Sequence, residues 1–217
     1  MTADRVVRVS PERLPGWVER FAGRHGDVVV EPGPATVILT AADESVAAVT
    51  VPFPPLADSP DPLTVLFDHC RRDRLVGALL VRRGGYAVGL FAGRHLRSSK
   101  VGHSYVQGRT KAGGWSQQRF ARRRAGQADR AYAAAADSAY AVLAPVAEDL
   151  DALVGGGDRS GVEAVLDDPR LAPLRARLTG RVLPTPDPRL DVLRRFGETL
   201  REVEIRIADS PVLESSA

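Results

Sequence analysis

The 217-residue sequence lacks several features on which common protein classes depend. It has a single cysteine, Cys70, which excludes an internal disulfide and any zinc site built from several cysteines. No apolar run approaches the roughly 18 residues that a membrane helix needs. The first residues mix charged and apolar types and do not have the pattern of a signal peptide. We therefore expect a cytoplasmic protein with no membrane partner.

Acidic residues are missing from one continuous segment. Residues 74–128, called here the basic segment, contain twelve Arg or Lys and no Asp or Glu. Residues 1–73 have a net charge of −4 and residues 129–217 a net charge of −5. Compositional bias explains why 28 of the 30 basic residues are Arg, but it does not explain where the acids are absent. Such a segment is typical of proteins that bind a polyanion, most often a nucleic acid.

Several common catalytic motifs are also missing. The sequence has no phosphate-binding loop ending in Gly-Lys-Ser/Thr, no His-Glu-x-x-His and no Gly-x-Ser-x-Gly. The run 155–157 of three glycines is read as a turn at the end of a strand rather than as a phosphate site. The four histidines have no metal-ligand spacing, although His95 and His103 lie in the basic segment. We expect neither a metal nor a cofactor.

The order of segments predicts an α/β protein with a small N-terminal unit over residues 1–58. Residues 5–9, 27–31, 36–40 and 46–51 have the composition of strands, and a helix begins after Ser10-Pro11. Five prolines within residues 52–62 predict a domain boundary, because proline continues neither a helix nor a central strand.

Residues 63–209 are predicted to form a second domain, followed by a disordered tail over 210–217. We expect a three-layer domain with a mixed sheet, since strands and helices alternate. The expected strands are 75–82, 86–93, 101–107, 152–154, 181–183 and 203–208. The expected helices are 63–70, 118–153 with a kink at Pro145, 161–166, 170–178 and 188–202.

The strongest functional signal is the glycine-rich loop within residues 107–124. It combines positive charge, one Trp and two adjacent glutamines, and it leads from a predicted strand into the long helix. A polar connection capped by Ser116 would need only Gly and Ser, and would require neither the cations nor the Trp. Arg119, Arg122 and Arg123 share one face of the first helical turns, so they can contact successive phosphates.

The pattern Gly113-Gly114-x-Ser116-x-x-Arg119-Phe120-Ala121-Arg122 resembles the Gly-Gly-Gln loop and following helix of eukaryotic and archaeal peptide chain release factors. Trp115 stands where those factors have their catalytic glutamine. The sequence Gly114-Trp115-Ser116-Gln117 instead resembles the Gly-x-x-Gln of the release-factor-like hydrolases of ribosome quality control, in their bacterial VLRF-type branch. The resemblance covers about residues 63–208.

This resemblance implies an RNase H-like catalytic domain that hydrolyses the ester of peptidyl-tRNA in the peptidyl-transferase centre of the large ribosomal subunit. It implies Gln117 as the catalytic residue, supported by Gly113, Gly114 and Ser116, with Gln118 as the alternative one position on. The expected RNA-binding residues are Arg97, Lys100, His103, Arg109, Lys111, Trp115, Arg119, Arg122, Arg123 and Arg124.

Two other functions fit the same residues. One is an endonuclease that cuts tRNA near its CCA end, with Arg stabilising charge and His103 moving the proton. The other is a non-catalytic ribosome- or RNA-binding module in which the loop only anchors the protein.

Overall fold

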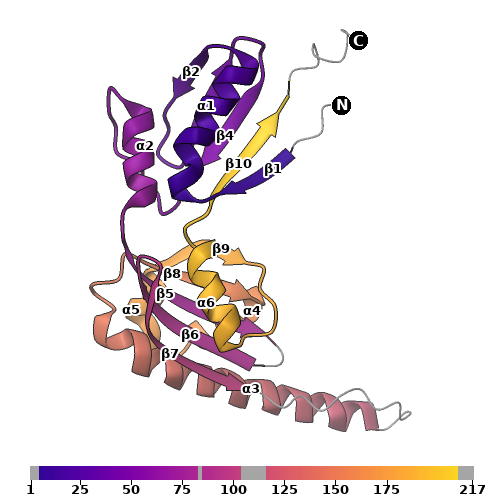
Figure 1. Ribbon diagram of the computed structural model, residues 1–217. Coiled ribbons are helices and arrows are strands. Elements are labelled where there is room, and N and C mark those ends of the chain that lie inside the picture. The colour runs from indigo at the N-terminus through magenta and orange to yellow at the C-terminus, as the bar shows by residue number, and fades with distance from the viewer. Residues whose placement is uncertain (1–4, 83–84, 104–115, 210–217) are drawn as a thin grey trace. The chain divides into compact units, whose positions relative to one another are not determined.

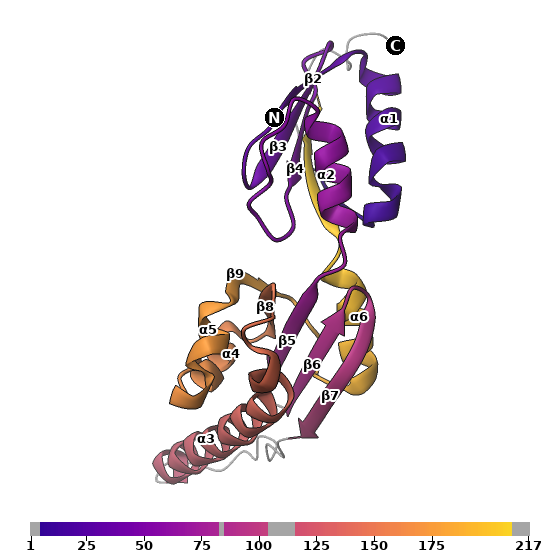
Figure 2. The ribbon, with the colours of Figure 1, turned by 90° about the vertical axis from the view of Figure 1, so that its left-hand side faces the viewer.

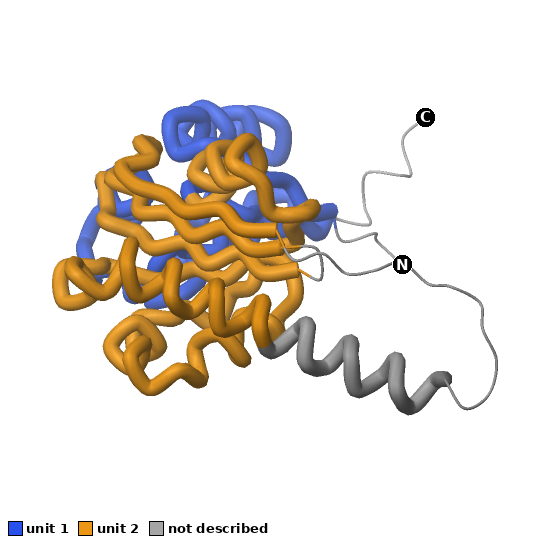
Figure 3. Tube along the Cα trace, turned by 90° about the horizontal axis from the view of Figure 1, so that it is seen from below, with its two compact units in different colours: residues 1–72, 201–217 blue, residues 73–200 orange. Residues whose placement is uncertain are grey.

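The computed structural model describes residues 5–82, 85–103 and 116–209, and for residues 116–129 it describes the helix but not the side chains. The chain divides into two compact units, residues 1–72 with 201–217 and residues 73–200 (Figure 3). Each unit is built on one five-stranded sheet. The predicted mixed α/β class is therefore confirmed. The predicted tail, residues 210–217, lies outside the described residues.

The first unit has an entirely antiparallel sheet with strand order β1-β10-β4-β3-β2. Its strands are β1 (Arg5–Val9), β2 (Val28–Glu31), β3 (Thr36–Ala41), β4 (Val46–Thr50) and β10 (Val203–Ala208). Its helices are the 3-10 turn η1 (Pro11–Arg13), α1 (Leu14–His25) and α2 (Pro62–Arg71) (Figure 1). Pro11 opens η1, as the Ser10-Pro11 pair predicts, and Asp61 caps α2 by accepting a hydrogen bond from the Thr64 N–H.

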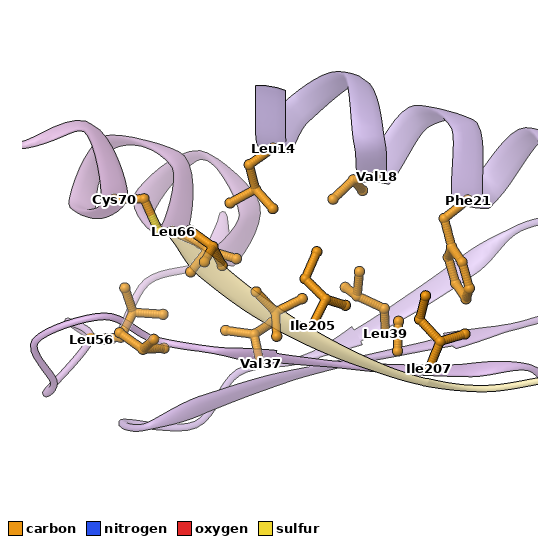
Figure 4. Close-up of a cluster of buried hydrophobic side chains, with 14 of the residues drawn as sticks. Leu14, Val18, Phe21, Val37, Leu39, Leu56, Leu66, Cys70, Ile205 and Ile207 are labelled. Atoms are coloured by element: carbon orange, nitrogen blue, oxygen red, sulfur yellow. The ribbon is translucent and has the colours of Figure 1, made fainter. Parts of the chain in front are cut away.

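Both helices of the first unit pack on one face of its sheet. In β3, Val37 and Leu39 are fully buried, whereas the alternate residues are only half-buried, because successive strand residues point to opposite faces. Figure 4 shows Leu14, Val18 and Phe21 of α1 directed toward these strand residues. The core of this unit thus lies between one sheet face and the two helices.

The second unit has a mixed sheet with strand order β7-β6-β5-β8-β9. The first three strands pair antiparallel, and β5, β8 and β9 pair parallel. The strands are β5 (Leu75–Arg82), β6 (Gly85–Ala92), β7 (His95–His103), β8 (Ala152–Gly157) and β9 (Leu178–Leu183). The helices are α3 (Ser116–Leu143), η2 (Ala144–Val146), α4 (Arg159–Leu166), η3 (Pro169–Leu171), α5 (Ala172–Ala176) and α6 (Leu190–Thr199).

Helices cover both faces of this second sheet. Residues of α3, α4 and α5 share one buried cluster with Leu79, Val88 and Leu153 of the sheet. On the other face α6 lies so close that a Cβ at Gly89 would stand 3.1 Å from the Leu193 side chain. Figure 2 shows α6 on the side of β5–β7 opposite to α4 and α5. Helices on both faces and a mixed sheet agree with the predicted layers.

The predicted domain boundary is wrong in two places. Helix α2 belongs to the first unit, because Leu66 and Cys70 are buried in that unit's core. Strand β10 also belongs there, where Ile205 and Ile207 are buried between β1 and β4. The prolines from 52 to 60 therefore lie in a loop inside the first unit and Pro62 begins α2, while the second unit is inserted between α2 and β10.

Three predicted elements also change their limits. Strand β7 begins at His95 rather than at residue 101, and α3 ends at Leu143 because Pro145 falls in the following 3-10 turn and stops the helix instead of kinking it. The glycines 155–157, predicted to form a turn at the end of a strand, lie within β8 itself. They are needed for close packing, since a Cβ at Gly156 would stand 2.8 Å from Thr185 Oγ1.

Candidate RNA-binding and catalytic site

Strand β7 is the described part of the predicted RNA-binding surface. It forms one edge of the second sheet, pairing with β6 through residues such as Gly85 and His103. Arg97, Lys100 and His103 are exposed on it. Among the described residues, no acidic side chain forms an ion pair with these three or with Arg94 in the preceding turn. The exposed cations are thus available to contact a polyanion.

Two other cations of the basic segment differ from those on β7, because one is buried and the other is bonded to neighbouring groups. Arg74 is 9% exposed. Arg82 donates a hydrogen bond to the Thr185 carbonyl oxygen at 3.1 Å, and its Nε lies 4.0 Å from carboxylate oxygens of Asp158 and Asp187. The basic segment is therefore not uniformly a binding surface. Of the cations of this segment that the structure describes, the exposed ones without an acidic partner lie on the β6–β7 hairpin.

The remaining predicted site residues lie outside what the structure describes. These are Gly113, Gly114, Trp115, Ser116, Gln117 and Gln118, with Arg109, Lys111, Arg119, Arg122, Arg123 and Arg124, either as whole residues or as side chains. The neighbouring elements are described. Strand β7 ends at His103 and α3 begins at Ser116, so the glycine-rich sequence connects a strand to a helix, and Gln117 is the second residue of that helix.

The register places the start of this connection at a defined end of the sheet. His103 pairs with Gly85, and Gly85 pairs with Arg82, the last residue of β5. Gly157, the last residue of β8, pairs with Val81. The chain therefore leaves β7 at the end of the sheet where the parallel strands β5 and β8 also finish. Sequence reasoning did not foresee the Arg82 group at this end, because it depends on residues 76 to 105 positions apart.

The acidic residue that the structure describes on α3 is neutralised by a neighbour. Asp137 accepts a hydrogen bond from Arg170 at 2.7 Å, and Arg170 also binds Asp168 at 2.7 Å and lies 5.5 Å from the ring centroid of Tyr140. Hydrogen bonds from Arg170 hold the pKa of Asp168 below its usual value. Arg170 thus links α3 to η3, and the Asp137 carboxylate of α3 is engaged in an ion pair.

The other reactive residue types have structural roles. His25 is buried, with its Nδ1 2.8 Å from Asp43 Oδ2, and the His69 ring donates to the Pro52 carbonyl oxygen at 2.8 Å. Cys70 is a core residue. Within the described residues, no group of three or more His, Cys, Asp or Glu side chains is arranged to hold a metal ion. No described helix is long and apolar enough to cross a membrane.

Comparison with known proteins decides the family. The model of the Actinobacteria/Chloroflexi VLRF1 release factors matches residues 74–206, more than half of the chain. The chain belongs to this VLRF1 release factor family. The match includes the whole basic segment and the glycine-rich sequence. Residues 1–73, which form most of the first unit, lie outside it.

Solved structures give more distant similarities. The chain is similar to the archaeal translation termination factor aRF1, with 12% identity, 87% of this chain and 61% of that chain covered, and a TM-score of 0.41. A second similar structure, described as an archaeal protein, has 15% identity, 73% and 48% coverage, and a TM-score of 0.37. The chain thus spans less than two thirds of the aRF1 chain. No curated protein matches significantly.

Proposed function

We propose that this VLRF1 family protein hydrolyses the ester between a nascent peptide and tRNA on stalled ribosomes, and that Gln117 is its catalytic residue. The observation that carries the proposal is the Gly114-Trp115-Ser116-Gln117 sequence between β7 and α3, in a chain of a release factor family. Gln118 is the alternative if the register differs by one.

The chemistry suits a glutamine amide. Such an amide has donors and an acceptor but no useful pKa, so it orients a water molecule rather than removing its proton as a base. One well-placed donor to the developing oxyanion contributes about 3–4 kcal/mol. Holding the water and the ester in line contributes about 7–11 kcal/mol more. Gly113 and Gly114 allow the backbone to approach the ester, and Ser116 begins the helix that carries Gln117.

The proposed partners are peptidyl-tRNA and the peptidyl-transferase centre of the large ribosomal subunit. Exposed, unpaired cations on β7 support an RNA partner, because phosphates are the groups that Arg and Lys bind most strongly in RNA. The proposed contacts are Arg97, Lys100 and His103 on β7, with Arg109, Lys111, Trp115, Arg119, Arg122, Arg123 and Arg124. Trp115 stacks on a base in this proposal, which contributes about 1–3 kcal/mol.

The decisive experiment incubates purified stalled ribosome–nascent-chain complexes with the protein. We expect released peptide and tRNA with an intact CCA end. Gln117→Ala should lower the rate by about 10²–10³-fold, while the matched variant Gln118→Ala retains most of it. A shortened tRNA would identify an endonuclease instead. Binding without release, unaffected by Gln117→Ala, would identify a non-catalytic module.

A further inference from the structure

Two of the contacts that hold α3 on the second unit lie at opposite ends of its sheet. Near its C-terminus, Leu143 covers Gly77, where a Cβ would stand 3.2 Å from Leu143 Cδ1. Five residues earlier, the Ser138 hydroxyl forms a 3.0 Å hydrogen bond with the Tyr86 hydroxyl. Gly77 lies near the start of β5 and Tyr86 near the start of the antiparallel β6, so these contacts lie at opposite ends of the strands. Figure 2 shows α3 running beside these strands.

The Tyr86 side chain packs tightly against the neighbouring strand β7. Tyr86 pairs with Gly102 of β7, and a Cβ at position 102 would collide with the phenol ring. Glycine at 102 therefore lets the ring lie flat across the neighbouring strand. Ser138 is 7% exposed, so its hydroxyl has little access to water and depends on Tyr86 for a partner. Tyr86, Gly102 and Ser138 are called the seat of α3.

The seat lies far from Gln117 along a single helix. An α-helix rises about 1.5 Å per residue. Leu143 and Ser138 are then about 7.5 Å apart along the axis, and Leu143 and Gln117 about 39 Å apart. If Leu143 stays in place, a 1 Å shift of α3 at the seat moves the start of the helix by about 5 Å. A displacement of about 1 Å at a reacting group can lower a rate by about 10²-fold.

We propose that the seat fixes the direction of α3 and so places Gln117, which makes Tyr86, Gly102 and Ser138 positioning residues for the reaction. The inference rests on the proposed function insofar as Gln117 is the reacting group. Its structural content, that the Tyr86–Ser138 hydrogen bond sets the direction of α3, is independent of that function. The two parts are therefore tested separately.

The kinetic test uses the stalled-ribosome assay over a range of ribosome concentrations. Tyr86→Phe and Ser138→Ala each remove the hydrogen bond with little change in volume. We expect each to lower the maximal rate about tenfold, with the half-saturating ribosome concentration changed less than twofold, because the RNA-binding cations are untouched. The double variant should be no slower than either single variant, since both break one bond. Gly102→Ala should be slower still.

Tyr140→Phe is the matched control, because Tyr140 lies on the same helix, is 47% exposed, and keeps in this variant the ring that Arg170 contacts. It should retain the wild-type rate. Wild-type rates in Tyr86→Phe and Ser138→Ala would overturn the positioning role. So would multiplying losses in the double variant, or a rate loss that follows a lowered melting temperature and a weakened ribosome affinity.

The structural test needs no activity. Nitroxide labels at Ala121→Cys on α3 and Glu163→Cys on α4, in a Cys70→Ala background, report the direction of α3 by pulsed dipolar spectroscopy. We expect Tyr86→Phe to shift or broaden the distance distribution by several ångströms, and Tyr140→Phe to leave it unchanged. An unchanged distribution in Tyr86→Phe overturns the inference. If the distribution shifts while the wild-type protein releases no peptide, the seat stands and the proposed function fails.

Discussion

The two units of this chain differ in net charge and in how the cations of an exposed edge strand are partnered. The first unit, residues 1–72 and 201–217, has a net charge of −5, whereas residues 73–200 have a net charge of +8. Both units contain ion pairs, such as Arg8 with Glu204 at 3.2 Å and Arg201 with Glu12 at 2.8 Å in the first, and Arg170 with Asp137 at 2.7 Å in the second. In the second unit the cations of β7 have no acidic partner among the described residues. The difference supports the proposed contact between the second unit and RNA.

The two sheets also differ in how many of their faces are covered by helices. The first has helices on one face only and is antiparallel throughout. The second lies between two helix layers, and glycines such as Gly156 bring the layers close together. Tight packing on both faces supports α3 rigidly. A reaction that depends on the precise placement of catalytic groups requires such support.

The largest effect is expected from deleting residues 201–217. This removes β10, the one strand that pairs with β1, and takes Val203, Ile205 and Ile207 out of the first core. The first unit should then unfold completely, while the second unit retains its protected amides. Hydrogen exchange measures both in one sample. Deleting residues 210–217 alone is the control and should leave both units folded; loss of protection in both units of the longer deletion would show that they fold as one.

A matched pair of glycine substitutions compares packing in the two units. In Gly156→Ala the new methyl group would meet Thr185, Leu80 and Phe196 at 2.8–3.1 Å, which should destabilise the second unit by about 1–3 kcal/mol. Gly23→Ala in α1 has nothing within 4 Å and should stabilise the first unit by about 0.4–1 kcal/mol. Denaturant unfolding measures both. Equal effects of the two substitutions would mean that the second unit is no more tightly packed than the first.

The sequence predicted local structure well because helices and strands have local patterns. The alternation in β3 and the apolar spacing of Ala135, Ala139 and Leu143 in α3 are examples, and each is buried as expected. The assignment of β10 failed because strand pairing joins residues about 200 positions apart, as in Arg5 and Ile207. The glycines of β8 misled for a related reason. Glycine favours turns locally, but here the close approach of Thr185 and Val162 requires it in a strand.

The candidate site was predictable to a different extent. The basic segment and the glycine-rich loop stand out in the sequence, and the positions of β7 and α3 on either side of the loop are confirmed. The seat was not predictable, because Tyr86 and Ser138 are 52 positions apart and neither belongs to a motif. The distinction between Arg82, which bonds to Thr185, and Lys100, which has no acidic partner among the described residues, also needs the fold, since both are simply cations in the sequence.

A smaller effect is expected from cations on the two outer strands β7 and β1. Arg97→Gln with Lys100→Gln should reduce the slope of log affinity for RNA against log salt by about 0.7 for each cation that meets a phosphate. Arg5→Gln is the matched control, because Arg5 is also exposed on an edge strand but belongs to the acidic unit. It should leave the slope unchanged. Fluorescence anisotropy at several salt concentrations gives the slopes, and equal slopes for all variants would remove the charge argument.

The smallest effect concerns acid stability and is specific to each unit. Burial acts to raise the pKa of Asp43, but hydrogen bonds from His25 and Ser45 outweigh it, so the pKa lies below its usual value. A carboxylate with a lowered pKa in the folded state adds stability above its unfolded pKa of about 3.9, and this stability is lost as the pH falls through the folded pKa. The first unit should therefore lose stability below about pH 4, and Asp43→Asn should flatten that dependence.

Asp168→Asn should flatten the pH dependence of the second unit in the same way, because Arg170 lowers the pKa of the Asp168 carboxylate. Unfolding free energies of each unit, measured by hydrogen exchange between about pH 3 and 6, test this. Each substitution should change the pH dependence of its own unit only. A change in the other unit would show that the two units are linked in stability, even though they differ in charge.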